Sequence, residues 1–306
     1  MIQTQNLTKR YRKKIAVNDL SFSIETGKVT GFLGPNGAGK STTMRLMLGL
    51  DSGGGTTTFD GQRLHDYARP SQVIGILLEA KAFHPTRTAR QHLRVLADAG
   101  GIPGKRVDEA LAEVGLTDVA KSKPGKFSLG MSQRLGIAAA ILGKPRYLML
   151  DEPANGLDPE GIAWLREFLK NYADQGNGVF VSSHLLSEMA QMADNVVVIG
   201  KGQLIAATSI TDLIAKNSHS GVFVRSPKLS VLERALHGTK AEVSKYEDGL
   251  KVIGMDTTDI GKIAFEAGVP IYELATQSAS LEEAFLELTA GSEEYVARPA
   301  AKKEAK

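Results

Sequence analysis

The stretch Gly34–Thr42 (GPNGAGKST) combines residue types at a spacing that suits the binding of phosphate groups. It fits the pattern G-x-x-x-x-G-K-[ST], follows the apolar run KVTGFL and opens the helical pattern TTMRLMLGL. Its glycines let backbone N–H groups turn inward around phosphate oxygens, where a side chain would collide. Lys40 is expected to reach the β- and γ-phosphates during catalysis, and the Ser41 hydroxyl to ligate Mg²⁺. The chain is therefore predicted to bind a nucleoside triphosphate through Asn36, Gly37, Ala38, Gly39, Lys40, Ser41 and Thr42.

Two adjacent acids follow a second apolar run, Tyr147–Pro153 (YLMLDEP). The carboxyl ends of strands in open α/β sheets line ligand clefts, so both acids are expected to face the nucleotide. Asp151 is predicted to hold magnesium, as acids at this position do in other phosphate-loop enzymes. Glu152 is predicted to accept a proton from an attacking water.

A second candidate phosphate site lies in Lys126–Ala138 (KFSLGMSQRLGIA). Ser128 and Gly130 stand just ahead of an apolar-periodic helix that is predicted to begin near Gln133. A helix N-terminus with a serine hydroxyl and free backbone N–H groups suits an anion. The chain therefore has two phosphate-binding segments far apart in sequence.

The elements that must position these residues alternate short β-branched runs with helical patterns up to about residue 216, which predicts an α/β fold with a parallel sheet. Lys216–Gly221 (KNSHSG) is predicted to be a polar linker. The strand and helix patterns after it follow the order βαββαβα, with a hairpin turn at Asp248–Gly249, which indicates a small α+β domain of ferredoxin-like type. We thus expect an ATPase domain over residues 1–216, a small domain over 217–292 and a disordered tail over 293–306.

Composition limits the possible functions. The 306 residues are 42% hydrophobic and 23% charged, as in an ordinary soluble globular protein. A net charge of +3, spread along the chain, gives no case for a nucleic-acid partner. The absence of cysteine excludes thiolate metal sites, and no metal other than Mg²⁺ is expected. No apolar run approaches the roughly 18 residues that span a bilayer, so a membrane role requires a partner.

The phosphate loop, FSLGMSQR, LDEPANGLD and VSSH, in this order, resemble the ATP-binding subunit of an ATP-binding-cassette (ABC) transporter over roughly residues 2–215. The resemblance implies a parallel-sheet core with a helical subdomain, and a dimer with a second copy or a homologue. In such a dimer each ATP lies between one phosphate loop and the opposite signature segment. That segment is Phe127–Met131 here, where Leu129 and Met131 depart from the family's L-S-G-G-Q. Ser128 and Gly130 match the positions that contact the γ-phosphate.

Further single residues of this sequence match functional positions of the family. Tyr11 stands where the family has an aromatic residue that stacks on adenine, and His184 where it has a histidine that reaches the γ-phosphate. Asn155–Asp158 resembles the loop that meets the opposite phosphate loop. Glu79 takes the place of a glutamine that touches magnesium and the attacking water, and a carboxylate can also ligate magnesium. The surface near Glu79–Arg90 would face a separate transmembrane permease.

Glu79, the sequence SLGMSQRLGIA and the closing SASLEEAFLELT resemble one branch of the family, the ATPase subunits of bacitracin- and daunorubicin-resistance exporters. The favoured function is the ATPase of a drug, antibiotic or peptide exporter, held at the cytoplasmic face of the cell membrane by its permease. One alternative is a soluble ABC ATPase of translation or DNA repair, although such proteins generally carry paired cassettes or long coiled-coil insertions. The other is a regulatory nucleotide-binding module, against which the intact Lys40, Asp151, Glu152 and His184 argue.

Overall fold

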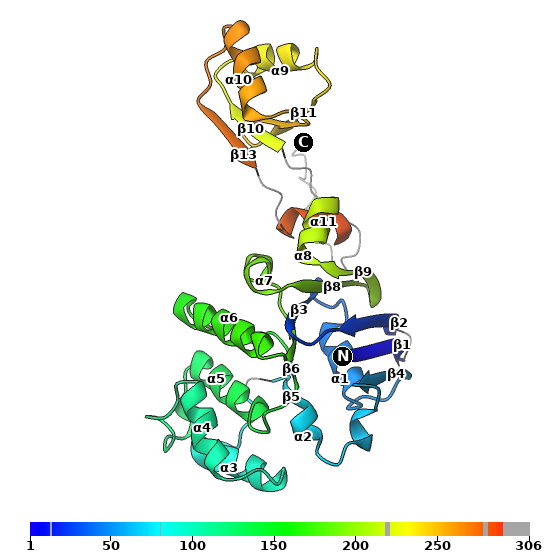
Figure 1. Cartoon of the computed structure of the whole chain (residues 1–306), viewed down its shortest axis with the longest axis vertical. Coiled ribbons are helices and arrows are strands. Elements are labelled where there is room, and N and C mark those ends of the chain that lie inside the picture. The colour runs from blue at the N-terminus through cyan, green and yellow to red at the C-terminus, as the bar shows by residue number, and fades with distance from the viewer. Residues whose placement is uncertain (13, 80, 218–220, 278–280, 290–306) are drawn as a thin grey trace, which may run out of the picture. The chain divides into compact units, whose positions relative to one another are not determined.

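The computed structural model describes residues 1–12, 14–79, 81–217, 221–277 and 281–289. The chain divides into two compact units, Met1–Ile210, to which Thr289 is joined, and Thr211–Leu288 (Figure 1). Lys216 lies in helix α8 (Ile210–Asn217), so the predicted linker is wrong at its first residues. The predicted tail, residues 293–306, lies outside the described residues.

A six-stranded sheet forms the centre of the first unit, in the order β5 (Ile74–Leu77), β6 (Tyr147–Leu150), β7 (Gly178–Ser182), β3 (Lys28–Leu33), β8 (Asn195–Gly200) and β9 (Gln203–Ser209). Neighbouring strands are parallel from β5 to β8, and β9 pairs antiparallel with β8. All residues of β6 and β7 are buried, which explains their continuous apolar sequences. The predicted parallel sheet is confirmed, with one antiparallel edge strand.

A second, antiparallel sheet joins β2 (Lys14–Ile24), β1 (Ile2–Tyr11) and β4 (Gly54–Phe59). Side chains from both sheets share one core with helix α1 (Lys40–Met47). Within it the rings of Phe22, Phe32 and Phe180 lie 4.9–5.9 Å apart between centroids. This packing fixes the end of β3, where the phosphate loop begins.

The other helices of this unit are α2 (Pro70–Val73), α3 (Ala89–Ala99), α4 (Lys105–Glu113), α5 (Leu129–Ala140), α6 (Pro159–Asp174) and α7 (Leu186–Met192). Helices α3, α4 and α5 pack on one another, and α5 also packs on β5. Helix α5 begins at Leu129, earlier than the predicted start near Gln133, because the Ser128 hydroxyl accepts the Met131 N–H at 3.1 Å and caps the helix. Gly130 is therefore inside the first turn.

The second unit contains β10 (Gly221–Arg225), α9 (Leu229–Leu236), β11 (Glu242–Tyr246), β12 (Gly249–Ile253), α10 (Thr257–Glu266) and β13 (Glu273–Gln277), together with α8 after its first residue and α11 (Leu281–Thr289) before its last. Its antiparallel sheet has the order β11-β12-β10-β13, and Val222, Leu232, Leu250 and Ile260 lie in its core. The strands and helices follow the predicted order.

The hairpin turn in this unit falls one residue earlier than predicted. Tyr246 pairs with Gly249, so the turn residues are Glu247 and Asp248. Gly249 is the first residue of β12, and a Cβ there would be 2.4 Å from the Val224 carbonyl oxygen, so the strand needs glycine at this position. The glycine therefore marks a close approach of backbones and not the turn itself.

Candidate nucleotide-binding site

A cavity of about 560 Å³ opens at the carboxyl end of β3. We call it the phosphate-loop cavity, and its lining residues are Tyr11, Lys14, Ala16, Pro35, Asn36, Gly37, Ala38, Gly39, Lys40, Ser41, Thr42, Glu152, Asn155 and His184. The whole predicted phosphate loop after Gly34 thus lies on one cavity with Tyr11, Glu152 and His184.

Strand order explains why residues so distant in sequence meet. Strands β6, β7 and β3 are parallel neighbours, and the register pairs Leu150 with Val181 and Phe32 with Ser182. Their carboxyl ends therefore lie at one edge of the sheet, where ligand sites of such sheets occur. Glu152 follows β6, and His184 follows β7, at this edge.

The phosphate loop turns sharply into α1. Gly39 has φ 104°, and a Cβ at this position would be 2.5 Å from the Ala16 carbonyl oxygen, so only glycine fits. The Lys40 ammonium donates to the Gly34 carbonyl oxygen at 2.7 Å and lies 3.8 Å from Glu152 Oε1. Burial lowers the pKa of Lys40, although the nearby Glu152 and Asp151 carboxylates oppose this shift. The cation is thus held at the wall of the cavity by the Gly34 carbonyl and the Glu152 carboxylate.

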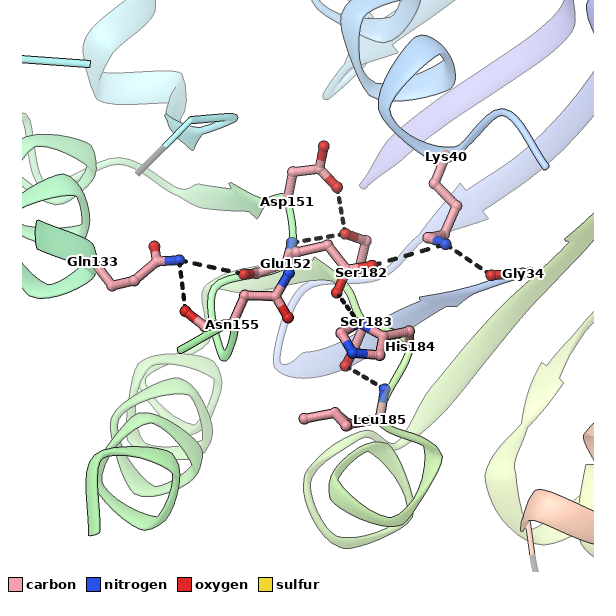
Figure 2. A network of polar contacts seen from close by, with 10 residues as sticks. All are labelled: Gly34, Lys40, Gln133, Asp151, Glu152, Asn155, Ser182, Ser183, His184 and Leu185. Carbon is pink, nitrogen blue, oxygen red and sulfur yellow. Dashed lines mark hydrogen bonds and ion pairs between the residues drawn. The ribbon is translucent and has the colours of Figure 1, made fainter. Parts of the chain in front are cut away.

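The side chains of Glu152 and His184 are in direct contact in the lining of the cavity. His184 Nδ1 lies 2.7 Å from Glu152 Oε2, and both side chains reach the cavity from neighbouring strand ends (Figure 2). A carboxylate only accepts hydrogen bonds, so Nδ1 carries the proton in this contact. The pair has the composition needed to take a proton from a bound water.

Asp151 lies beside this pair and is not among the residues that line the cavity. Its Oδ1 accepts a hydrogen bond of 2.5 Å from the Ser182 hydroxyl, which also accepts the Glu152 N–H at 2.9 Å. Ser182 is fully buried at the end of β7. One hydroxyl therefore joins the two acids, and the other oxygen of Asp151 takes no part in this bond.

Tyr11 ends β1 and presents its ring to the cavity. The side chain is 46% exposed, and its hydroxyl donates to Asp51 Oδ2 at 2.9 Å. This hydrogen bond is the main reason that the pKa of Tyr11 is raised. The Lys9 ammonium lies over one face of the ring, 4.8 Å from its centroid, so an adenine would have to stack on the opposite face.

The remaining predicted site residues lie elsewhere on the chain. Ser128 and Gly130, at the start of α5, do not line the phosphate-loop cavity. Glu79 is exposed and lines a separate groove of about 600 Å³. We call it the α3–α5 groove; its apolar lining includes Leu50, Ile74, Ile76, Leu77, Phe83, Leu96, Ile102, Leu135 and Leu142. The structure therefore does not bring Glu79 to the phosphate loop.

Two polar residues at the site were not predicted from the sequence. Ser182 joins the two acids, and Gln133 of α5 donates to the main-chain oxygens of Glu152 and Asn155 (Figure 2). A signal existed for Ser182, because a serine ends an otherwise apolar strand. Gln133 had no such signal, since its contacts depend on how α5 packs.

Within the described residues, no helix is both long and apolar enough to cross a bilayer. Comparison with protein families shows that residues 17–155 match the family described as ABC transporter. Residues 220–282 match a domain of unknown function.

Relatives with similar sequences match the chain over nearly its whole length. An uncharacterized ABC transporter ATP-binding protein, YhcH of Bacillus subtilis, is 36% identical over 97% of this chain and 98% of its own. The bacitracin transport ATP-binding protein BcrA of Bacillus licheniformis is 36% identical over 95% and 98%. The linearmycin resistance ATP-binding protein LnrL of Bacillus subtilis is 33% identical over 94% and 98%.

Solved structures are similar to about two thirds of this chain or slightly more. An ATP-binding subunit of an ABC transporter superposes with a TM-score of 0.64 at 29% identity, covering 71% of this chain and 92% of that one. A bacterial ABC transporter cassette solved as a dimer has a TM-score of 0.62 at 24% identity, over 68% and 98%. The likeness to the dimeric cassette is one of fold.

Proposed function

Because this chain belongs to the ATP-binding proteins of ABC transporters, we propose that ATP binds in the phosphate-loop cavity and that its hydrolysis drives a separate membrane permease. A member of this family is an ATPase. One observation supports ATP hydrolysis in this cavity. The phosphate loop, Glu152 and His184 line the same cavity. Lys40 neutralises the β- and γ-phosphates, and the ring of Tyr11 stacks on adenine.

Hydrolysis needs a base beside the γ-phosphate. A water attacks the γ-phosphorus and its proton passes to the carboxylate of Glu152, while the bond from that phosphorus to the β–γ bridging oxygen breaks and ADP leaves. His184 orients that carboxylate through Nδ1, and its ring reaches the γ-phosphate. The contact of 2.7 Å between the two side chains supports this division of roles.

The donor set at the edge of the sheet fits Mg²⁺. Ser41 supplies a hydroxyl oxygen at the start of α1, and Asp151 a carboxylate whose second oxygen does not bond Ser182. Magnesium prefers such oxygens and keeps several waters, so few protein ligands suffice. When bound, the ion would neutralise charge on the β- and γ-phosphates. Ser41 and Asp151 are the proposed ligands; a magnesium contact of Glu79 would need its loop to approach the nucleotide.

Two chains assemble around the nucleotides in this proposal. Ser128 and the first N–H groups of α5 form a capped helix start that does not line the phosphate-loop cavity of its own chain. A phosphate bound there must therefore come from another site, which supports a dimer with a second copy or a homologue. The signature segment of one chain would then contact the γ-phosphate held by the other.

The α3–α5 groove is the proposed docking surface for the permease. It includes Glu79, Ala82 and Phe83 of the predicted contact segment, and Ile76 and Leu96 on it are exposed apolar side chains. An apolar groove with such a rim suits an amphipathic helix of a partner. Docking would hold the chain at the cytoplasmic face of the membrane. The named activities of BcrA and LnrL support export of a drug, an antibiotic or a peptide.

Co-purification with a polytopic membrane protein tests the transport assignment. The intact chain should retain the permease, and Leu96→Glu should lose it while still binding ATP. Leu204→Glu, at an exposed position of strand β9 that does not line the groove, is the matched control. Retention of the permease by Leu96→Glu would place docking elsewhere. A chain without any membrane partner would favour the alternative, a soluble ATPase of translation or DNA repair.

The small domain, residues 217–292, is proposed to be ferredoxin-like. Its element order βαββαβ and its sheet order β11-β12-β10-β13 support that topology. We propose that it steadies the dimer or contacts the permease, since the lining of the phosphate-loop cavity ends at His184.

A further inference from the structure

Gln133 is a buried polar residue that forms its hydrogen bonds through the nitrogen of the side-chain amide. The side chain is 4% exposed on α5, and its Nε2 donates to the main-chain oxygens of Glu152 and Asn155, each at 3.4 Å. Its Oε1 is buried and has no hydrogen-bond partner among the described residues. The reversed amide would point an oxygen at two carbonyl oxygens, so the donor must face them. Figure 2 shows this contact reaching the acid from the side opposite Lys40.

The residue that receives this contact has an unusual backbone. Glu152 has φ 49°, in the left-handed region that non-glycine residues seldom adopt. Such a conformation persists only where the surroundings hold it. The Glu152 N–H donates to Ser182 Oγ at 2.9 Å, and the Glu152 oxygen accepts from Gln133 and from the Asn155 N–H at 3.2 Å. Both peptide groups of Glu152 are thus held.

A purely packing role does not account for the choice of glutamine. Its helix neighbours Leu135, Ile137 and Ala138 are buried and apolar. Leucine or methionine would fill a similar volume without leaving a buried acceptor unpaired, which is unfavourable. The amide donor must therefore supply something that an apolar side chain does not.

We propose that Gln133 is a positioning residue for the catalytic base: its amide fixes the turn Glu152–Asn155 and so directs the Glu152 carboxylate at the attacking water. This inference rests on the proposed role of Glu152. The backbone conformation of Glu152 sets the direction in which its side chain leaves the main chain. Of the two carboxylate oxygens, Oε2 lies 2.7 Å from His184 Nδ1 and Oε1 lies 3.8 Å from Lys40 Nζ. Because Gln133 lies in the helix capped by Ser128, the base is tied to the signature segment of its own chain.

Steady-state ATPase kinetics of Gln133→Leu in the full chain test the proposal. We expect kcat to fall roughly 3- to 10-fold, the worth of one modest hydrogen bond. KM for ATP should stay within about twofold, because Gln133 does not line the phosphate-loop cavity. Gln191→Leu, at an exposed position of α7, is the control and should keep parental kinetics. An unchanged kcat in Gln133→Leu would overturn the proposal.

A second variant keeps the test independent of folding defects in the first. In Gln133→Glu the introduced carboxyl donates only while protonated, so its activity relative to the parent should fall as pH rises. At low pH, where that carboxyl is protonated, a role in packing alone predicts the same kcat for Gln133→Glu as for Gln133→Leu, and that outcome would count against positioning.

A double-mutant cycle then separates this inference from the proposed function. If Gln133 acts through Glu152, Gln133→Leu should cause no further loss of kcat in a Glu152→Gln background. The same fold-loss in both backgrounds would contradict positioning and leave the base intact. Parental activity of Glu152→Gln alone would instead remove the proposed base, and with it the reason for positioning.

Discussion

The Leu129 side chain occupies the space that a side chain on Gly156 would need. A Cβ on Gly156 would lie 2.0 Å from Leu129 Cδ2, and one on Gly130 would lie 3.2 Å from Leu157 Cδ2. The signature segment and the Asn155–Asp158 loop thus fit into each other within one chain. The departure of Leu129 from the glycine of the family's signature is matched by Gly156, which also has φ 74°.

Gly156→Ala should therefore be more harmful than a glycine substitution in open space. We expect it to lower the free energy of unfolding by about 1–3 kcal/mol through backbone strain and the clash with Leu129, and to reduce ATPase activity. Gly176→Ala is the control, because Gly176 has φ 86° with nothing near its Cβ position. Adding Leu129→Ala should restore part of the loss by removing the clash. Equal destabilisation by the two glycine substitutions, measured by denaturant titration, would refute the interlock.

Glu152→Gln should keep ATP binding and lower kcat at least roughly a hundredfold, the value of a lost general base. A trapped ATP-bound dimer should accumulate, because closure no longer ends in cleavage. Equilibrium nucleotide binding, phosphate release and size-exclusion chromatography measure these effects. Glu167→Gln, at an exposed position of α6, should behave as the parent. Parental turnover in Glu152→Gln would exclude this residue as the base.

The trans arrangement predicts complementation between defective chains. Lys40→Ala removes the phosphate cation, and Ser128→Asp keeps the helix cap while repelling the γ-phosphate. A mixed dimer has one intact composite site and one doubly damaged site. We expect partial recovery of ATPase activity on mixing, provided that one site can turn over. Recovery by protein that stays monomeric would contradict action in trans.

Asp60 should make stability depend on pH. Burial raises its pKa, but hydrogen bonds from the N-terminal ammonium and from Tyr147 outweigh this effect, and the net pKa is lowered. A lowered folded-state pKa stabilises the protein above the unfolded value of about 3.9, and this contribution is lost as pH falls through the folded value.

Asp60→Asn removes that charge and keeps a residue that tolerates the φ of 49°. We expect a loss of about 1–2 kcal/mol near neutral pH, which shrinks below about pH 4. Urea titrations of both proteins between about pH 3 and pH 7 measure it. A difference that does not vary with pH would show that charge is not the cause.

Truncation after Asn217 tests the small domain. ATP affinity should survive, because every residue that lines the phosphate-loop cavity precedes it. Concentration-dependent ATPase activity or association with the permease should weaken if the domain supports assembly. Assays of all three properties on the shortened and the full chain decide this. Equal results throughout would make the domain a passive appendage.

Much of the site could be predicted because its motifs are local. The phosphate loop requires glycine where the backbone turns, as at Gly39, and this requirement can be recognised in a short run of consecutive residues. Buried strands such as β6 and β7 are likewise readable from unbroken apolar runs. The predicted start of α5 is wrong because Ser128 caps the helix earlier in the chain. The predicted turn at Asp248–Gly249 is wrong because Gly249 is needed where two backbones approach closely.

The sequence by itself determined which groups are available: a phosphate loop, two acids, a histidine and a capped helix start. Only the tertiary structure decided which of them meet. The order β6-β7-β3 brings Glu152 to His184, and the packing of α5 brings Gln133 to Glu152 and Leu129 to Gly156. Strand order and helix packing arise from the burial of apolar faces over the whole domain. Because this driving force is non-directional, no single residue of the sequence reveals which elements will pack together.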